Sequence, residues 1–190
     1  MLKQIRAFIA IEITEQMRQE LSRIQSQLKP RLPGKISWVR PENIHLTLRF
    51  LGNIDQQMLL QIKQAIVDTA DTASGFFAGL GELGAFPKVY NPRVIWIGIN
   101  AGQDKLKALH AQLQEKLNCI GSALEEKDFH PHLTIARVKL LKDKQALETL
   151  LPQIKPLNLS TAINRIILFQ SQLSPQGAIY SKLFEQKLKM

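Results

Sequence analysis

The sequence has little of what marks a secreted, membrane or disulfide-bonded protein. Its 190 residues include a single cysteine, Cys119, so the chain can form neither an internal disulfide nor a cysteine-rich metal site. Its early apolar stretch, residues 7–11, ends at Glu12 and is too short for a signal sequence or a membrane span. We therefore expect a cytoplasmic protein in which Cys119 is a small buried residue of a helix.

The chain also has no low-complexity tract, and its 45% hydrophobic and 22% charged residues are typical of a folded domain. The 25 Lys and Arg residues exceed the 16 acidic residues and give a formal charge of +9. Such an excess favours polyanionic partners such as nucleic acid or phosphorylated small molecules, although a solvated basic surface would have the same composition. The length is that of one domain.

Hydrophobic periodicity and turn residues predict the same order of elements twice. The first half is expected to contain a strand at 6–13, a helix capped by Thr14, strands at 36–39 and 44–51, and a helix at 56–72. The second half is expected to contain a strand at 93–99, a helix at 103–120, an acidic loop at 125–128, a strand at 132–138 and a helix at 142–150. Residues 79–91 are expected to be a loop, and strands at 157–173 and 178–188 form a hairpin around a turn at 174–177.

The two halves share a short motif. Arg6 precedes His45 by 45 − 6 = 39 residues, and Arg93 precedes His132 by 132 − 93 = 39 residues, so the halves align at an offset of 87 without a gap. His-Leu-Thr-Leu at 45–48 then falls on His-Leu-Thr-Ile at 132–135. Chance would rarely repeat such a pair at about one residue in twenty per type. The repetition indicates a functional pair.

The motif carries its own chemistry. On a strand, His45 and Thr47 point to one face while the leucines beside them point to the other, and His132 and Thr134 do the same. A duplicated fold that sets the two pairs opposite each other would line a groove with two imidazoles and two hydroxyls. Two histidines can serve as base and acid at a phosphodiester, and hydroxyls can donate hydrogen bonds to its non-bridging oxygens. No metal is required.

Two other interpretations of the histidines remain. Each motif alone would fit a partly buried histidine satisfied by a neighbouring hydroxyl or carbonyl. His130 and His132 also suggest a zinc site, but Pro131 lies between them and no Cys, Asp or Glu follows in ligand spacing. We expect His130 to be a supporting or surface residue and His110 to lie on the surface or boundary of its helix.

The whole sequence resembles the 2H phosphoesterases and, within them, the RNA 2′,3′-cyclic phosphodiesterases of the LigT-like 2′-5′ RNA ligase family. The resemblance covers nearly all 190 residues. It is carried by RAFIA at 6–10, WVRPENIHLTLRFLG at 38–52, RVIWIG at 93–98, FHPHLTIAR at 129–137 and SQLSPQGAIY at 171–180.

The resemblance implies a single bilobal α+β domain over residues 1–190, with a pseudo-twofold duplication. Two antiparallel sheets would line a central cleft, with helices outside. The implied reaction opens a 2′,3′-cyclic phosphate, on an RNA end or a nucleoside, to a 2′-phosphomonoester without a cofactor. His45 would be the general acid and His132 the general base, with Thr47 and Thr134 holding the phosphoryl oxygens. The symmetry of the sequence does not decide which histidine is the acid.

Three more residues are candidates for substrate binding. Phe50 and Arg137 each lie five residues beyond their histidine and match residues that the family places at the substrate. Regular alternation would turn both to the opposite face, so either a β-bulge intervenes or they are core and surface residues. Arg49 would stay on the histidine face, where it either lends positive charge to the cleft or is solvated. Ser171 and Tyr180 also match the family pattern, and we expect them to pack within the hairpin.

Other functions remain open beside this one. A related enzyme would join RNA by 2′-5′ ligation or open another cyclic nucleotide. A non-catalytic RNA-binding module is the alternative of another class, although binding alone would tolerate the loss of either histidine. In each case we expect a monomer that binds RNA ends or nucleoside cyclic phosphates, with no metal, cofactor or membrane.

Overall fold

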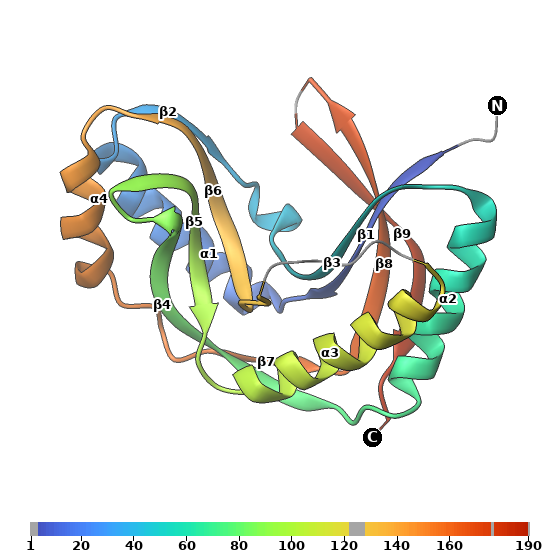
Figure 1. Ribbon diagram of the computed structural model, residues 1–190. Coiled ribbons are helices and arrows are strands. Elements are labelled where there is room, and N and C mark those ends of the chain that lie inside the picture. Colours follow the sequence, from blue (N-terminus) through green and yellow to red (C-terminus); the bar gives the residue numbers. More distant parts are fainter. Residues whose placement is uncertain (1–3, 122–127, 176, 190) are drawn as a thin grey trace.

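The structure is a computed structural model that describes residues 4–121, 128–175 and 177–189, so residues 125–127 of the predicted acidic loop lie outside it (Figure 1). The helices are α1 (Glu15–Leu28), α2 (Gln56–Ala70), α3 (Gln103–Cys119) and α4 (Lys144–Leu150). The strands are β1 (Ile5–Glu12), β2 (Gly34–Trp38), β3 (His45–Ile54), β4 (Phe76–Lys88), β5 (Asn91–Ile99), β6 (His132–Leu141), β7 (Ser160–Ile163), β8 (Arg165–Ser174) and β9 (Gly177–Lys187).

Within the described residues, the nine strands form one strongly curled sheet in the order β7-β4-β5-β6-β3-β1-β8-β9, with β2 paired to β6. The order has two matching halves. One lobe contains β3, β1, β8 and β9, and the other contains β6, β5, β4 and β7 (Figure 1). The expected duplicated, bilobal α+β fold is confirmed, and the sheets of its two lobes are joined where β3 meets β6.

Among the described residues, β3 and β6 are joined by one pair of equivalent residues. Leu46 of β3 pairs with Leu133 of β6, and both side chains are buried. Because the strands are antiparallel and the paired residues are repeat equivalents, a local twofold axis passes between them. One residue further along each strand, the same register sets His45 beside Thr134 and Thr47 beside His132.

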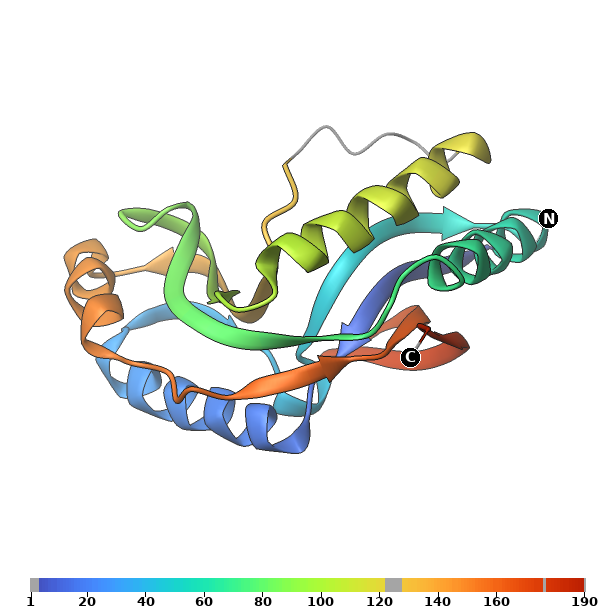
Figure 2. The same ribbon diagram turned by 90° about the horizontal axis from the view of Figure 1, so that it is seen from below.

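The helices pack on the outer surface of the curled sheet. α2 packs on β8 and β9, and α3 lies beside α2 and also reaches β4, whereas α1 and α4 lie on the side of the other lobe (Figures 1 and 2). Thr14 caps α1 as predicted, accepting a hydrogen bond from the Met17 N–H at 3.3 Å. The helix buries an apolar stripe at helical spacing, made up of Met17, Leu21, Ile24 and Leu28.

A β-bulge occurs at the same place in both motif strands. Thr47 pairs with Ala10 and Arg49 with Ile9, which leaves Leu48 as the extra residue of β3. The pairing of β6 with β5 skips Ile135 in the same way. An extra residue shifts the alternation of side chains by one beyond the bulge.

The bulges decide which side chains return to the concave face. Phe50 is 59% exposed and Arg137 is also exposed, so the bulge interpretation of these two positions is confirmed. Arg49 is only 4% exposed, and its predicted position on the histidine face is wrong because the bulge turns it to the buried side. The repeat equivalent of Arg49 is Ala136, which is buried as well.

The alignment of the halves without a gap is wrong by one residue in the first strands. Ala10 lies opposite Thr47, and Trp96 lies opposite Thr134, so β1 and β5 correspond at an offset of 96 − 10 = 86. The motif strands β3 and β6 correspond at 133 − 46 = 87. The connection from first strand to motif is therefore one residue longer in the second half.

The largest error of the sequence analysis is the loop expected at 79–91, most of which is strand β4. Glycine and proline residues made this segment look irregular. Gly84 is needed in the strand because a Cβ there would overlap the ring of Trp96 on β5. The predicted strand at 157–173 is also wrong, since it contains two strands that are interrupted at Asn164.

The expected burial of Cys119 is wrong too, because its side chain is exposed. The buried stripe of α3 ends at Leu117, and a residue two places further on lies about 200° around the helix from it. The remaining helices and strands were predicted to within a few residues of their ends, and the C-terminal hairpin of β8 and β9 is confirmed.

A buried glutamine of α1 supports the bulge of β6. Gln25 is 1% exposed, and its amide nitrogen donates to the carbonyl oxygen of Ile135 at 2.8 Å and to that of Val39 at 2.7 Å. The Val39 N–H donates to the same Ile135 oxygen at 3.0 Å. The extra residue of the bulge is thus fixed by two donors from outside β6.

We expect Gln25→Met to lower the free energy of unfolding by roughly 2–4 kcal/mol, because the buried Ile135 oxygen and the partly buried Val39 oxygen each lose a donor. Urea denaturation measures the loss. The matched control is Gln112→Met, which makes the same change at an exposed position of α3. If both variants lose the same stability, Gln25 does not support the bulge.

Candidate active site

The two motifs meet on the concave face of the sheet. His45 and Thr47 extend from β3, and His132 and Thr134 from β6, all four partly exposed. The alternate positions are fully buried, at 2% exposure or less, and hold Leu46, Leu48, Leu133 and Ile135. The predicted division of each motif into a polar face and an aliphatic face is confirmed.

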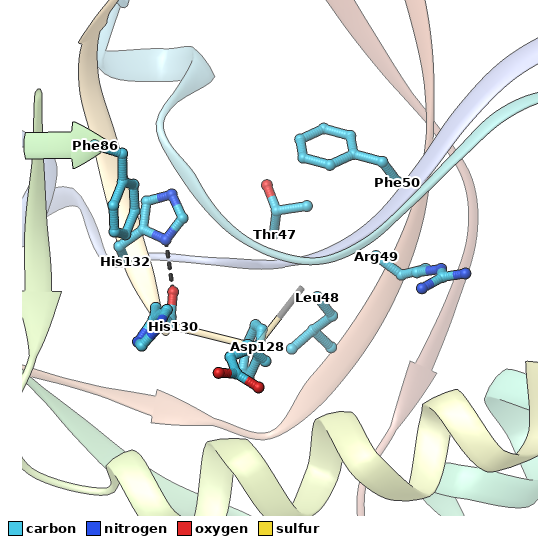
Figure 3. A pocket seen from close by; sticks show the side chains of 9 residues that line it. Thr47, Leu48, Arg49, Phe50, Phe86, Asp128, His130 and His132 are labelled. Atoms are coloured by element: carbon cyan, nitrogen blue, oxygen red, sulfur yellow. Dashed lines mark hydrogen bonds between the residues drawn. The ribbon is translucent and has the colours of Figure 1, made fainter. Parts of the chain in front are cut away.

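Each histidine is held by the backbone two residues before it. The Nδ1 of His45 lies 2.8 Å from the carbonyl oxygen of Asn43. The Nδ1 of His132 lies 2.6 Å from the carbonyl oxygen of His130, as Figure 3 shows. A carbonyl oxygen only accepts, so in both rings Nδ1 carries the proton and donates. The Nε2 atom is therefore the one left to exchange protons with a substrate, and the two rings are equivalent in this respect.

The backbone that holds His45 is itself tied to the C-terminal hairpin. The side-chain amide of Asn43 donates to the carbonyl oxygen of Ala178 on β9 at 2.8 Å. The hairpin thereby reaches across to the turn that precedes β3. This connection lies in the matched family segment at 38–52, but nothing in the sequence pairs Asn43 with residue 178.

Aromatic rings surround both histidines. The His45 ring stacks on Phe8 with the ring centres 4.7 Å apart and meets the edge of Tyr180 at 5.3 Å. The His132 ring meets Phe86 edge-on at 5.1 Å. Phe8 and Phe86 were not predicted at the site, because neither lies near a motif along the chain. Tyr180 was expected only to pack within the hairpin.

The surroundings keep both histidines neutral at neutral pH. Burial lowers the pKa of His45 from 6.5 to about 4, against the opposing effect of its bond to Asn43 and with a further lowering by the charge of Arg137. Burial also lowers the pKa of His132, and the charges of His130 and Arg137 lower it further. The charge of Arg137 thus acts on both rings.

Two hollows lie near the catalytic motifs, one lined by His132 and the other by Phe8 and Tyr180, whose rings contact His45. The histidine pocket, about 430 Å³, lies between Thr47 and Phe50 on one side and Phe86, His130 and His132 on the other. Figure 3 shows the Arg49 side chain directed away from Thr47 and Phe50, although Arg49 also borders this pocket.

The second hollow, the hairpin groove, has a volume of about 450 Å³. It extends from Arg137 to the β8–β9 hairpin. Its lining includes Arg6, Phe8, Phe50, Arg137, Leu173 and Tyr180.

Of the other two histidines, His130 lies beside His132, whereas His110 lies on α3. His130 contributes its carbonyl oxygen to His132 and lies with its ring centre 6.1 Å from that of Phe86. His110 of α3 stacks on Phe129 with ring centres 4.0 Å apart, in a partly buried position.

Among residues 4–121, 128–175 and 177–189, no three His, Cys, Asp or Glu side chains come together as metal ligands. None of the described helices is long and apolar enough to cross a membrane.

A curled, duplicated antiparallel sheet with a His-x-Thr motif on each of its two central strands is the architecture of a two-histidine phosphoesterase. The family model described as "LigT like Phosphoesterase" matches the chain twice, at residues 11–96 and 97–180. The chain belongs to this LigT-like phosphoesterase family.

Relatives cover the chain almost from end to end. The RNA 2′,3′-cyclic phosphodiesterase of Thermotoga maritima is 36% identical over 95% of this chain and 94% of its own length. That of Aquifex aeolicus is 32% identical over 97% of both. Among solved structures, E. coli LigT with 3′-AMP superposes with a TM-score of 0.81 at 23% identity, over 99% of this chain and 100% of LigT. A Thermus thermophilus protein gives 0.81 at 26% identity, over 97% of this chain and 98% of its own.

The lowered histidine pKa values predict how stability depends on pH. The pKa of His45 is about 4 in the folded protein and 6.5 when unfolded, so between these pH values the unfolded chain binds more protons. The free energy of unfolding should therefore fall as the pH is lowered from 6.5 towards 4. Urea denaturation at several pH values measures the slope, which should be shallower in His45→Gln. A slope that is the same in both proteins would contradict the lowered pKa.

Proposed function

We propose that this protein is an RNA 2′,3′-cyclic phosphodiesterase that hydrolyses a terminal 2′,3′-cyclic phosphate to a 2′-phosphomonoester. The observation that carries the proposal is the matched pair His45 and His132, each bound through Nδ1 to a carbonyl, with Nε2 left for the substrate. The relatives named RNA 2′,3′-cyclic phosphodiesterase support the substrate class. Acid–base chemistry by two imidazoles needs no metal and no cofactor.

The reaction uses the two rings in opposite protonation states. His132, neutral, takes a proton from water as the water oxygen attacks phosphorus. The bond from phosphorus to the 3′-oxygen breaks, and protonated His45 gives its proton to that oxygen. The products are a 2′-phosphomonoester and a free 3′-hydroxyl, and the two histidines have exchanged protonation states. Return of the proton from His132 to His45 through solvent completes the cycle.

The remaining site residues stabilise the charge on the phosphate. Thr47 and Thr134 donate hydrogen bonds to its non-bridging oxygens, and the guanidinium of Arg137 neutralises charge that builds up on them. The exposed ring of Phe50 offers a surface on which a base can stack. Arg49 contributes only at longer range, because the bulge has turned it to the buried side.

Binding of the substrate anion favours the protonated form of His45 that the reaction needs. In the free protein the pKa of His45 is about 4, so this ring is neutral before substrate binds. A bound phosphate anion favours the protonated imidazole and raises the pKa. A low pKa in the free protein would also suit a base, so the two roles are assigned by experiment.

The same site would support 2′-5′ ligation, because ligation reverses the hydrolysis with a 5′-hydroxyl in place of water. A non-catalytic RNA-binding module is disfavoured by the two matched backbone bonds, since binding alone requires neither ring to keep Nε2 free. We further propose that the protein acts in the cytoplasm, as a monomer.

We expect the protein to convert a short RNA ending in a 2′,3′-cyclic phosphate to the 2′-phosphate with EDTA present. His45→Ala and His132→Ala should each lower kcat at least about 100-fold while the protein stays folded, because each removes an acid or a base. Product separation and circular dichroism measure the two effects. Turnover that survives either substitution would exclude the two-histidine mechanism, and loss of activity in EDTA would indicate a metal.

A substrate with sulfur in place of the 3′-bridging oxygen separates acid from base, because a thiolate leaves without protonation. If His45 is the acid, this substrate should restore much of the turnover of His45→Ala and little of that of His132→Ala. Rescue of His132→Ala instead would exchange the two roles. Rescue of neither variant would show that proton donation is not the step lost.

A further inference from the structure

On the hairpin side of the histidines, the cleft continues as a positively charged groove. The hairpin groove has two guanidinium groups in its lining, those of Arg6 and Arg137, and no acidic side chain among the described residues that line it. The histidine pocket is different, because Asp128 lies in its lining and its one arginine, Arg49, is buried. A polyanion leaving the reaction centre is therefore favoured on the hairpin side.

The two arginines lie at different depths in the groove. The charge of Arg137 acts on the pKa of both histidines and of Tyr180, whereas that of Arg6 acts on Tyr180. The strand pairing gives the same order, because Arg6 lies opposite Asn53 on β3, 53 − 45 = 8 residues along that strand from His45, whereas Arg137 lies 137 − 132 = 5 residues beyond His132 on β6. Arg6 is therefore the cation further from the reacting phosphate. This succession of two cations along one groove matches a nucleic acid strand, which carries one negative charge per nucleotide.

The rim of the groove has unusually exposed apolar side chains. Phe50 is 59% exposed and lies between the two hollows, and Leu173 on the hairpin is 76% exposed. Large apolar groups beside cations suit a single strand, whose bases pack on them while its phosphates meet the arginines. The equivalent stretch of the other lobe offers Arg93, which is exposed and borders neither hollow.

We propose that the hairpin groove binds the nucleotide preceding the terminal one, with its phosphodiester on Arg6 and its base on the apolar rim. This inference rests on the proposed function and extends it to the choice of substrate. RNA ends would then be preferred over free nucleoside 2′,3′-cyclic phosphates. The groove would act by binding the chain, and Arg6 would take no part in the chemical step.

The test compares kcat/KM for a dinucleotide and for a nucleoside that both end in the same 2′,3′-cyclic phosphate, at low salt. Wild type should prefer the dinucleotide about tenfold, as one charge-assisted contact to a phosphate would supply. Arg6→Gln should bring this ratio close to one. Arg93→Gln removes the same charge outside the groove and should keep the wild-type ratio.

A dinucleotide with an uncharged methylphosphonate linkage identifies the contact. With wild type, the kcat/KM of this analogue should be no higher than that of the nucleoside. With Arg6→Gln, the analogue and the natural dinucleotide should have the same kcat/KM, because the substitution and the uncharged linkage remove the same interaction. Equal kcat/KM for both substrates with wild type, or a preference that survives Arg6→Gln, would overturn the inference while leaving the proposed function intact. If neither substrate is turned over, the proposed function itself is wrong.

Discussion

The pairing of Leu46 with Leu133 is the contact on which the site depends. These two residues are repeat equivalents, and both are buried where β3 meets β6. Their pairing makes the two lobes one sheet and puts a polar pair from each motif on the same concave face. A duplicated fold joined by a linker alone would leave the spacing of its two halves to loops. Here the hydrogen-bonded register of adjacent strands sets it.

Everything else at the site is positioned from the backbone outward. The two bulges turn Phe50 and Arg137 towards the cleft. Gln25 of α1 supports the bulge of β6 from behind the sheet. Carbonyl groups select the Nδ1 tautomer of both histidines. Rings from strands distant in sequence exclude water around the imidazoles, and this exclusion lowers their pKa values. In the proposed reaction a substrate anion would reverse that effect, so that a histidine becomes charged when a phosphate is bound.

The sequence was sufficient for what depends on local patterning. The two faces of each motif follow from strand alternation, the Thr14 cap from local chemistry, and the duplicated fold from the repeat and the family resemblance. The sequence was insufficient where a residue is determined by its partner on a neighbouring strand. The glycines of β4 suggested a loop. Gly84 in fact leaves room for the ring of Trp96, which comes from the neighbouring strand β5 and is not close in sequence.

Several site features had no local signal for the same reason. The burial of Arg49 depends on a bulge that the alternation rule does not contain, and Phe8 and Phe86 reach the histidines only through strand pairing. The one-residue difference in the alignment of β1 with β5 has no local signal either, because it is accommodated in the connection between the first strand and the motif. Residues that act in pairs across the sheet were thus found only when they also repeated along the chain, as the two histidines do.

The central claim, that both imidazoles face one phosphate, can be tested most directly by nitrogen NMR of the histidine rings. Spectra would be recorded near neutral pH with and without one equivalent of a nucleoside 2′-phosphate. We expect the Nδ1 of both His45 and His132 to be protonated in the free protein, and both Nε2 signals to shift as the single ligand binds. A response confined to one ring, or a proton on Nε2 in either free ring, would contradict the account.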